Sequence, residues 1–259
     1  MMALHTTEGR QIEPDIVNEA QRLLAAIERA GLDARLIGGM AIRLLAGDRL
    51  HPAYERPIQD LDFILTKRHR REFDRLMTGE GYVPDQEFNA LNGARRLLYD
   101  DPVHGRQVDV FVEAFAMCHV LPLAERIADR PRTLPAAELL MTKLQIVELN
   151  PKDRGDLYAL LHSHDVVENA AGDAIDVASI VALTATDWGL QHTFELNLRR
   201  LREALADQPL APAEASAIAS RIDAIADAME RAPKSRRWKL RAKVGERKRW
   251  YEEPEEVER

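Results

Sequence analysis

The sequence predicts an α/β (α+β) protein, in which a short mixed sheet flanked by helices is followed by a C-terminal helical domain. Strand-like and helical segments alternate over the first 118 residues, whereas from Leu121 onward only helical spacing is found. The length of 259 residues is enough for one large domain or two modest ones, each with a core. We therefore expect a mixed unit over 1–118, a helical domain over 119–232 and a separate C-terminal segment over 233–259.

The first elements lead to a pair of glycines. Apolar residues spaced as on one helix face predict a helix over 15–30, and Gly31 directly after it is a stop signal. The short apolar run 34–37 predicts a strand that enters a tight turn at Gly38-Gly39. Helical character resumes over 40–45.

The remaining strands are predicted from alternation and from valine and phenylalanine content. The clearest of them is the last, which is almost entirely apolar. In order, the sequence predicts a loop over 47–57, a strand over 61–65, a polar helix over 67–77, extended stretches over 82–88 and 95–99, and a strand over 108–115.

The second half of the chain is predicted to be helical because its apolar residues recur every three to four positions. The expected helices cover 134–149, 151–162, 174–188, 193–206 and 213–230.

Three aspartates form a candidate metal site. Side chains alternate along a strand, so Asp60 and Asp62 project to one side and Leu61 to the other. A divalent cation relieves the repulsion between neighbouring carboxylates, and hard oxygen ligands suit Mg²⁺. Asp109 interrupts an apolar strand and, if placed beside the first strand, completes a three-carboxylate cluster. Simpler interpretations remain open: an Asp-x-Asp at a strand start also serves as turn chemistry, and a half-exposed strand tolerates acids.

The order of these parts resembles the DNA polymerase β superfamily of nucleotidyltransferases. A strand, Gly38-Gly39, a helix start, Asp60-x-Asp62 and then Asp109 follow one another as in that family. Paired glycines let a phosphate approach the backbone, and the following helix start presents N–H donors to it. A Gly-Gly pair also occurs in ordinary tight turns.

The resemblance covers roughly residues 34–161 and is closest to AbiE-type toxin nucleotidyltransferases. The segments 134–144 and 152–157 look like the Lys and Asp motifs of that group. The usual Gly-Ser of the superfamily is Gly-Gly here, which removes a hydroxyl that helps to hold the triphosphate, and the gap from Gly39 to Asp60 is longer than in minimal members. AbiE-like and lincosamide-modifying members also carry Gly-Gly, so these departures concern the subfamily rather than the fold.

This resemblance implies an enzyme that transfers an NMP from an NTP to an acceptor hydroxyl and releases pyrophosphate, with Mg²⁺ as cofactor. It implies a nucleotidyltransferase core over 1–118 and phosphate contacts from Gly38 and Gly39. The acceptor, whether RNA, protein or a small molecule, is not fixed by the sequence. Two other classes stay open: an inactive nucleotide- or RNA-binding module, and a structural or interaction protein with an incidental acid cluster. The implied catalytic residues are Asp60, Asp62, Asp109, Lys143 and Asp153, of which the first three are the implied metal ligands.

Three further residues each have two interpretations. Lys143 lies in the middle of an apolar helical stripe, so it either extends its amine to the surface or meets an anion, which would be a phosphate or the acid cluster. Asp153 shares a helix face with Asp156 and belongs either to an N-terminal cap after Asn150 or to the site. Arg56 either contacts the triphosphate or is a solvated loop residue.

The C-terminal segment changes sign along its length. Nine Lys or Arg residues and one acid lie between Lys234 and Arg249, whereas the last nine residues hold five glutamates. Cations interleaved with aromatics over 234–251 meet the physical requirements for contact with single-stranded nucleic acid. The alternatives are docking on the chain's own acidic surface, with Trp238 and Leu240 as anchors, or a disordered tail.

The composition of the chain limits which partners and which cellular compartment are expected. The net charge of −7 argues against uniform non-specific binding to nucleic acid. One cysteine, Cys118, excludes an internal disulfide framework and fits a reducing compartment, and no apolar run is long enough for a membrane span. We therefore expect a cytoplasmic protein without membrane contact.

Overall fold

The computed structural model describes residues 12–169 and 173–253 and confirms the predicted fold class. Its largest sheet has five strands in the order β1-β2-β5-β4-β3, with β2 and β5 parallel and the other neighbours antiparallel. The strands are β1 (Ala34–Ile37), β2 (Leu61–Leu65), β3 (Val83–Pro84), β4 (Arg96–Asp100) and β5 (Gln107–Val112). The first two have the predicted bounds.

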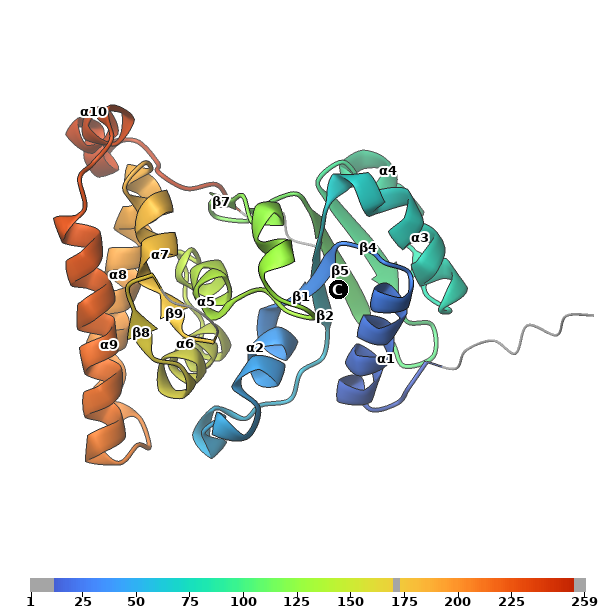
Figure 1. Cartoon of the computed structure of the whole chain (residues 1–259). Helices are drawn as coiled ribbons and strands as arrows, with labels where there is room; N and C mark the ends of the chain where they lie inside the picture. The colour runs from blue at the N-terminus through green and yellow to red at the C-terminus, as the bar shows by residue number, and fades with distance from the viewer. Residues whose placement is uncertain (1–11, 170–172, 254–259) are drawn as a thin grey trace, which may run out of the picture.

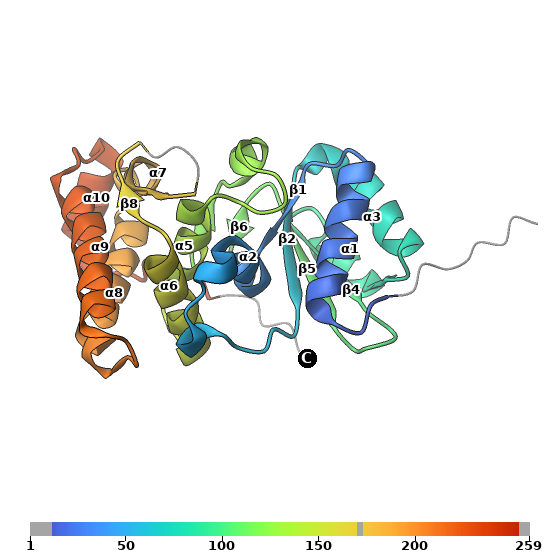
Figure 2. The same cartoon turned by 60° about the horizontal axis from the view of Figure 1, so that its bottom comes forward.

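Helices cover both faces of this sheet (Figures 1 and 2). On one side lie α1 (Ile16–Arg29) and α3 (Arg70–Gly79), where Phe63 of β2 contacts Phe73 of α3. On the other side lies α2 (Gly38–Ala46). Because side chains alternate along β2, Asp62 faces the α2 side and Phe63 faces α3.

Two predicted strands are wrong in part. The stretch 82–88 contains only the two-residue β3, because Asp85 caps a helix, α4 (Gln86–Asn92), by accepting a hydrogen bond from the Phe88 amide. The strand over 108–115 ends at Val112, since Glu113 adopts a positive φ of 69°. The chain then forms a separate hairpin of β6 (Phe115–Ala116) and β7 (Val120–Leu121).

From Leu123 on, the residues that the structure describes form helices and loops apart from one small sheet that was not predicted, in which β8 (Val166–Val167) pairs with β9 (Ile175–Asp176). The predicted helix over 134–149 ends early, at Leu144, and that over 174–188 begins at Val177 and ends at Thr184. The helices are α5 (Ala136–Leu144), α6 (Pro151–Ser163), α7 (Val177–Thr184), α8 (Trp188–Ala204) and α9 (Pro212–Arg231).

One hydrophobic core joins the two halves. It runs from Leu23 of α1 through Met40 of α2 and Leu160 of α6 to Met229 of α9. The division into 1–118 and 119–232 therefore stays a prediction. No helix among the described residues is long and apolar enough to cross a membrane.

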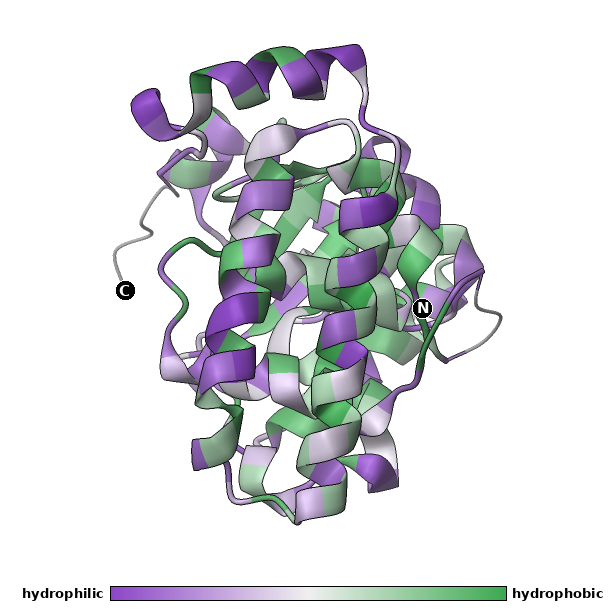
Figure 3. Cartoon of the chain, turned by 90° about the vertical axis from the view of Figure 1, so that its left-hand side faces the viewer, coloured by the Kyte–Doolittle hydropathy of each residue, from purple (hydrophilic) through white to green (hydrophobic). Residues whose placement is uncertain are grey.

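The basic segment forms a further helix, α10 (Arg236–Val244), which is mostly hydrophilic and lies at one end of the helical half (Figure 3). It contacts α8, as one of the predicted alternatives states, and of the two predicted anchors Trp238 is half-buried whereas Leu240 is not. Leu240 is 65% exposed, whereas the Trp250 indole donates a hydrogen bond to Thr193 Oγ1 at 3.0 Å. The end of the acidic stretch, residues 254–259, lies outside the described residues.

Candidate active site

Gly38 and Gly39 form the first turn of α2, two residues earlier than predicted. Gly38 has a φ of +67°, and a Cβ atom at this position would overlap the carboxylate of Asp62. A Cβ at Gly39 would overlap the guanidinium of Arg56. The glycines are therefore required where the chain turns from β1 into α2, because a carboxylate and a guanidinium both pack against the helix start. Ile37, the N-cap residue, contributes no side-chain cap.

Asp62 lies at the centre of the acidic cluster. Its register partner on the parallel strand β5 is Asp109, and on β1 it is Ile37. Burial, together with the negative charges of Asp109 and Asp60, raises the pKa of Asp62 to about 7 against the opposing charges of Lys143 and Arg96. The structure thus brings together the three aspartates that were predicted from sequence.

Asp109 is held by a residue that the sequence analysis missed. Arg96 of β4 binds its carboxylate through two nitrogens, with Nε 2.8 Å from Oδ1 and Nη2 2.5 Å from Oδ2. The guanidinium lies between the rings of Phe88 and Phe111, 5.7 and 5.1 Å from their centroids. The signal was weak, since a single arginine in a short strand is ordinary and its partner lies on a different strand.

Lys143 meets carboxylates rather than extending to the surface. Its Nζ lies 2.7 Å from Asp153 and 3.0 Å from Asp156. Asp156 also accepts two hydrogen bonds from Arg56, at 2.8 and 3.0 Å. Burial opposes ionisation of Asp156, but the bonds from Arg56 and the charge of Lys143 outweigh it and lower its pKa.

These four side chains form an alternating charged network. Burial tends to lower the pKa of Lys143, but the charges of Asp156 and Asp153 raise it, so the amine is held as a cation. Arg56 was expected to be either a triphosphate contact or a solvated residue, and it has a third role as a partner of Asp156. The sequence places Asp156 on the same helix face as Asp153, but its position between Arg56 and Lys143 was not predicted.

The predicted cap at Asp153 is present, and its role in the site stays a prediction. Its backbone amide donates to Asn150 Oδ1 at 2.9 Å, which is the predicted cap at the start of α6, with Pro151 as the first helical residue. Its carboxylate meanwhile contacts Lys143. The cap thus positions the first carboxylate of the network.

A pocket of about 490 Å³ lies between the start of α2, the strand β2 and the helices α5 and α6. Carboxylates and cations line it together, and its polar residues Gln59, Asn150 and Lys152 were not predicted as site residues. Its lining consists of Gly39, Arg56, Pro57, Ile58, Gln59, Asp60, Asp62, Lys143, Asn150, Lys152 and Asp153.

Of the three predicted metal ligands, Asp60 and Asp62 line this pocket, whereas Asp109 lies beside it and contacts Arg96. Across residues 12–169 and 173–253, no group of three or more His, Cys, Asp or Glu side chains is arranged to hold a metal ion. The donor set nevertheless suits a hard cation, since Asp60 and Asp62 bring carboxylate oxygens to one cavity and their mutual charge raises the pKa of Asp62.

Comparison of the chain with models of known protein families and with curated proteins gives no match.

Proposed function

We propose that this protein is a Mg²⁺-dependent nucleotidyltransferase that moves an NMP from an NTP to an acceptor hydroxyl. The observation that carries the proposal is the shared pocket, in which Asp60 and Asp62 face the first turn of α2 together with Lys143 and Lys152. Acids that hold a cation and amides that hold a phosphate are what an NTP-dependent transfer needs on opposite sides of one cavity.

Asp60 and Asp62 would hold the magnesium, with Asp109 as a further ligand on the adjacent strand. When bound, Mg²⁺ neutralises the triphosphate and lowers the pKa of the attacking hydroxyl. The ion pair between Arg96 and Asp109 fixes the orientation of this third carboxylate, so Arg96 acts as a positioning residue.

The triphosphate is proposed to bind at the start of α2. The helix dipole and the amides of the Gly38-Gly39 turn favour a negative group there, and Gly39 lines the pocket beside the guanidinium of Arg56. Lys143 and Lys152 add positive charge at the wall of the same pocket, where pyrophosphate develops. Arg56 is engaged by Asp156, and it supports the phosphate site by holding α6 against the helix start.

The proposed transfer forms one bond, breaks one bond and moves one proton. The acceptor oxygen forms a bond to the α-phosphorus, the bond from that phosphorus to the β-phosphate oxygen breaks, and pyrophosphate leaves with the bonding electrons. The hydroxyl proton passes to a carboxylate, for which we propose Asp109, because Arg96 holds it beside Asp62.

The test is incubation of the purified protein with each labelled NTP, Mg²⁺ and total cell RNA or protein, with pyrophosphate release and acceptor labelling as readouts. We expect metal-dependent transfer that is abolished in Asp62→Asn. Asp227→Asn, an exposed acid on α9, is the matched control and should react as the unchanged protein does. Absence of pyrophosphate release with every NTP and acceptor would refute the transfer.

One alternative has a specific observation in its favour. The glycine pair lacks the superfamily's serine hydroxyl, and Asp109 is engaged by Arg96, so a module that binds nucleotide without transferring it fits these two features. It predicts that Mg-NTP raises the melting temperature while no NTP is consumed. A structural protein with an incidental acid cluster predicts no stabilisation by Mg-NTP at all.

We also propose that α10 and the residues after it contact RNA through the phosphate backbone. Docking occupies Trp250, while most of the cations stay exposed, which supports electrostatic contact rather than base stacking. A cytoplasmic location belongs to the same proposal. The exposed cations are Arg236, Arg237, Lys239, Lys243, Arg247, Lys248 and Arg249.

A further inference from the structure

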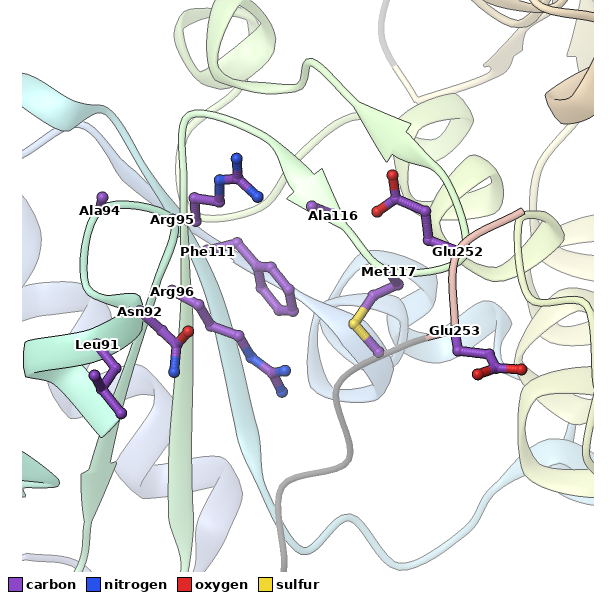
Figure 4. Close-up of a pocket in the computed structure, with 10 residues that line it drawn as sticks. All are labelled: Leu91, Asn92, Ala94, Arg95, Arg96, Phe111, Ala116, Met117, Glu252 and Glu253. Carbon is purple, nitrogen blue, oxygen red and sulfur yellow. The ribbon is translucent and has the colours of Figure 1, made fainter. Parts of the chain in front are cut away.

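A second pocket, of about 270 Å³, lies on the other side of Arg96 (Figure 4). Arg96 and Phe111 form part of its wall, and Phe111 follows Asp109 by two residues on β5, so its side chain lies on the same face of the sheet. The pocket therefore opens next to the proposed catalytic carboxylates. It lies at a different wall of the site from the pocket lined by Lys143 and Lys152.

The far wall of this pocket comes from the end of the chain. Glu252 and Glu253 line it opposite Arg95 and Arg96, together with Met117 (Figure 4). The Glu252 amide donates a hydrogen bond to the Cys118 carbonyl at 2.9 Å, which fixes the segment beside β6 and β7. Two carboxylates thus border a pocket whose opposite wall carries two guanidinium groups.

The segment is anchored just before the pocket by Trp250. Its ring packs edge-on against His192 at 4.9 Å and Trp188 at 6.4 Å, and its indole N–H is bonded to Thr193. The anchor fits closely, because a Cβ atom on Gly189 would lie 2.6 Å from the Trp250 carbonyl oxygen. We term residues 250–253 the strap. Among the described residues, its further contacts are with its own neighbour Arg249, which pairs with Glu253 at 2.9 Å and lies over the ring of Tyr251.

We propose that the strap is an autoinhibitory device that closes the pocket beside Asp109. This inference rests on the proposed function: the NTP occupies the pocket at the α2 start, so the acceptor hydroxyl has to approach Asp109 from the Arg96 side. In the closed arrangement the strap narrows that approach and places two negative charges at its rim. Because Glu253 is paired with Arg249 and the opposite wall carries Arg95 and Arg96, the obstruction is steric, and the acceptor reaches Asp109 only when the strap withdraws.

Two variants release the strap from opposite sides. Trp250→Ala removes the anchor from the strap itself. Gly189→Ala keeps the sequence of the strap but displaces it, because the new Cβ atom overlaps the Trp250 carbonyl oxygen. The substitution should not weaken α8 itself, since alanine has a higher helix propensity than glycine. Gly79→Ala is the matched control, since no atom lies within 4 Å of a Cβ at that helical position in α3.

Closure is measured without reference to activity. In the full chain, Met117→Cys combined with Cys118→Ala places a single thiol at the wall of the pocket and keeps the backbone carbonyl that holds Glu252. We expect a maleimide to label this thiol roughly tenfold faster when Trp250→Ala or Gly189→Ala is added, and at an unchanged rate with Gly79→Ala. Equal labelling rates in the thiol variant and in its three derivatives would overturn the proposal that the strap closes the pocket.

Regulation is measured as NTP turnover of the same release variants in the otherwise unchanged chain. Turnover that rises several-fold in both supports autoinhibition, and turnover that stays constant or falls while labelling accelerates overturns it. If no protein in the series, released or closed, consumes any NTP, the proposed function fails and the regulatory role with it, whereas the labelling still decides whether the strap closes the pocket.

Discussion

Asp62 and Asp109 face each other directly across the parallel strands β2 and β5, although 46 residues separate them in the chain. Neighbouring strands lie about 4.8 Å apart, so two like charges are held close together by backbone hydrogen bonds rather than by any attraction between them. Arg96 contacts only one of the pair, Asp109. Burial and the nearby negative charge of Asp109 therefore disfavour ionisation of Asp62 and raise its pKa.

The first prediction concerns the pH dependence of stability in metal-free buffer. Because the pKa of Asp62 is raised to about 7 in the folded protein, the folded state retains a proton that the unfolded chain has already lost between about pH 4 and pH 7. The free energy of unfolding should fall as the pH rises through this window, by on the order of 4 kcal/mol from this group. Urea denaturation of the unchanged protein and of Asp62→Asn from pH 4 to 8 measures the difference, and parallel curves would contradict it.

The second prediction concerns ligand binding. Saturating Mg-NTP should raise the melting temperature of the unchanged protein by mass action, with about 2.7 kcal/mol of stabilisation at a ligand concentration one hundred times Kd. Asp60→Asn and Asp62→Asn should lose this shift without loss of intrinsic stability, since removing one of two repelling acids relieves strain. Differential scanning fluorimetry measures the effect. A full shift in Asp62→Asn would remove this residue from the site.

The third prediction separates the structural and catalytic roles of Lys143. Lys143→Met should destabilise the fold by about 1–3 kcal/mol, because Asp153 and Asp156 lose a buried partner, and should slow turnover by roughly 100-fold. Adding Asp156→Asn should restore part of the stability and none of the turnover. Equilibrium unfolding and initial rates of the two single variants and the double variant form the cycle. Recovery of turnover in the double variant would show that Lys143 acts only by neutralising Asp156.

The fourth prediction concerns the start of α2. Gly38→Ala meets both a positive φ and the carboxylate of Asp62, whereas Gly31→Ala meets a positive φ of 64° with no atom within 4 Å of the new Cβ. Placing alanine at a positive φ should lower the free energy of unfolding by about 1–2 kcal/mol in both variants. The difference between them therefore measures the overlap with Asp62, which should cost roughly 1–3 kcal/mol more. Chemical denaturation of both variants tests this, and equal losses would mean that Asp62 moves aside without cost.

The fifth prediction concerns the basic surface of α10. Binding of a short RNA duplex should weaken steeply with salt, and replacing Arg236, Arg237, Lys239 and Lys243 by Gln should reduce the slope of log K against log salt by about 3–4. A control with the same change of charge, Gln at Arg71, Arg75, Arg199 and Arg202, should leave the slope unchanged. Because Trp250 is used in docking, single-stranded RNA of the same length should bind no more tightly than the duplex. Tighter binding to anionic vesicles than to RNA would assign the surface to a membrane instead.

The local parts of the site could be predicted from the order of the residues alone. Alternation along 61–65 placed Asp60 and Asp62 on one face, and the apolar run at 34–37 followed by two glycines marked the strand that enters α2. These features depend on side-chain periodicity and on the φ angles open to glycine, which are properties of neighbouring residues. For the same reason the cap of Asn150 and the placement of Lys143 in a core-facing stripe could be predicted.

Which charged side chains contact one another depends instead on how distant segments of the chain pack together. Arg56 and Asp156 are 100 residues apart, and Trp250 lies 57 residues from Thr193, so no spacing in the sequence indicates either contact. Asp109 could be assigned to a strand, but its pairing with Arg96 follows from the register of β4 on β5. Such partners are selected by strand register and helix packing over the whole chain, and a carboxylate in a protein interior accepts whichever cation that packing brings within reach.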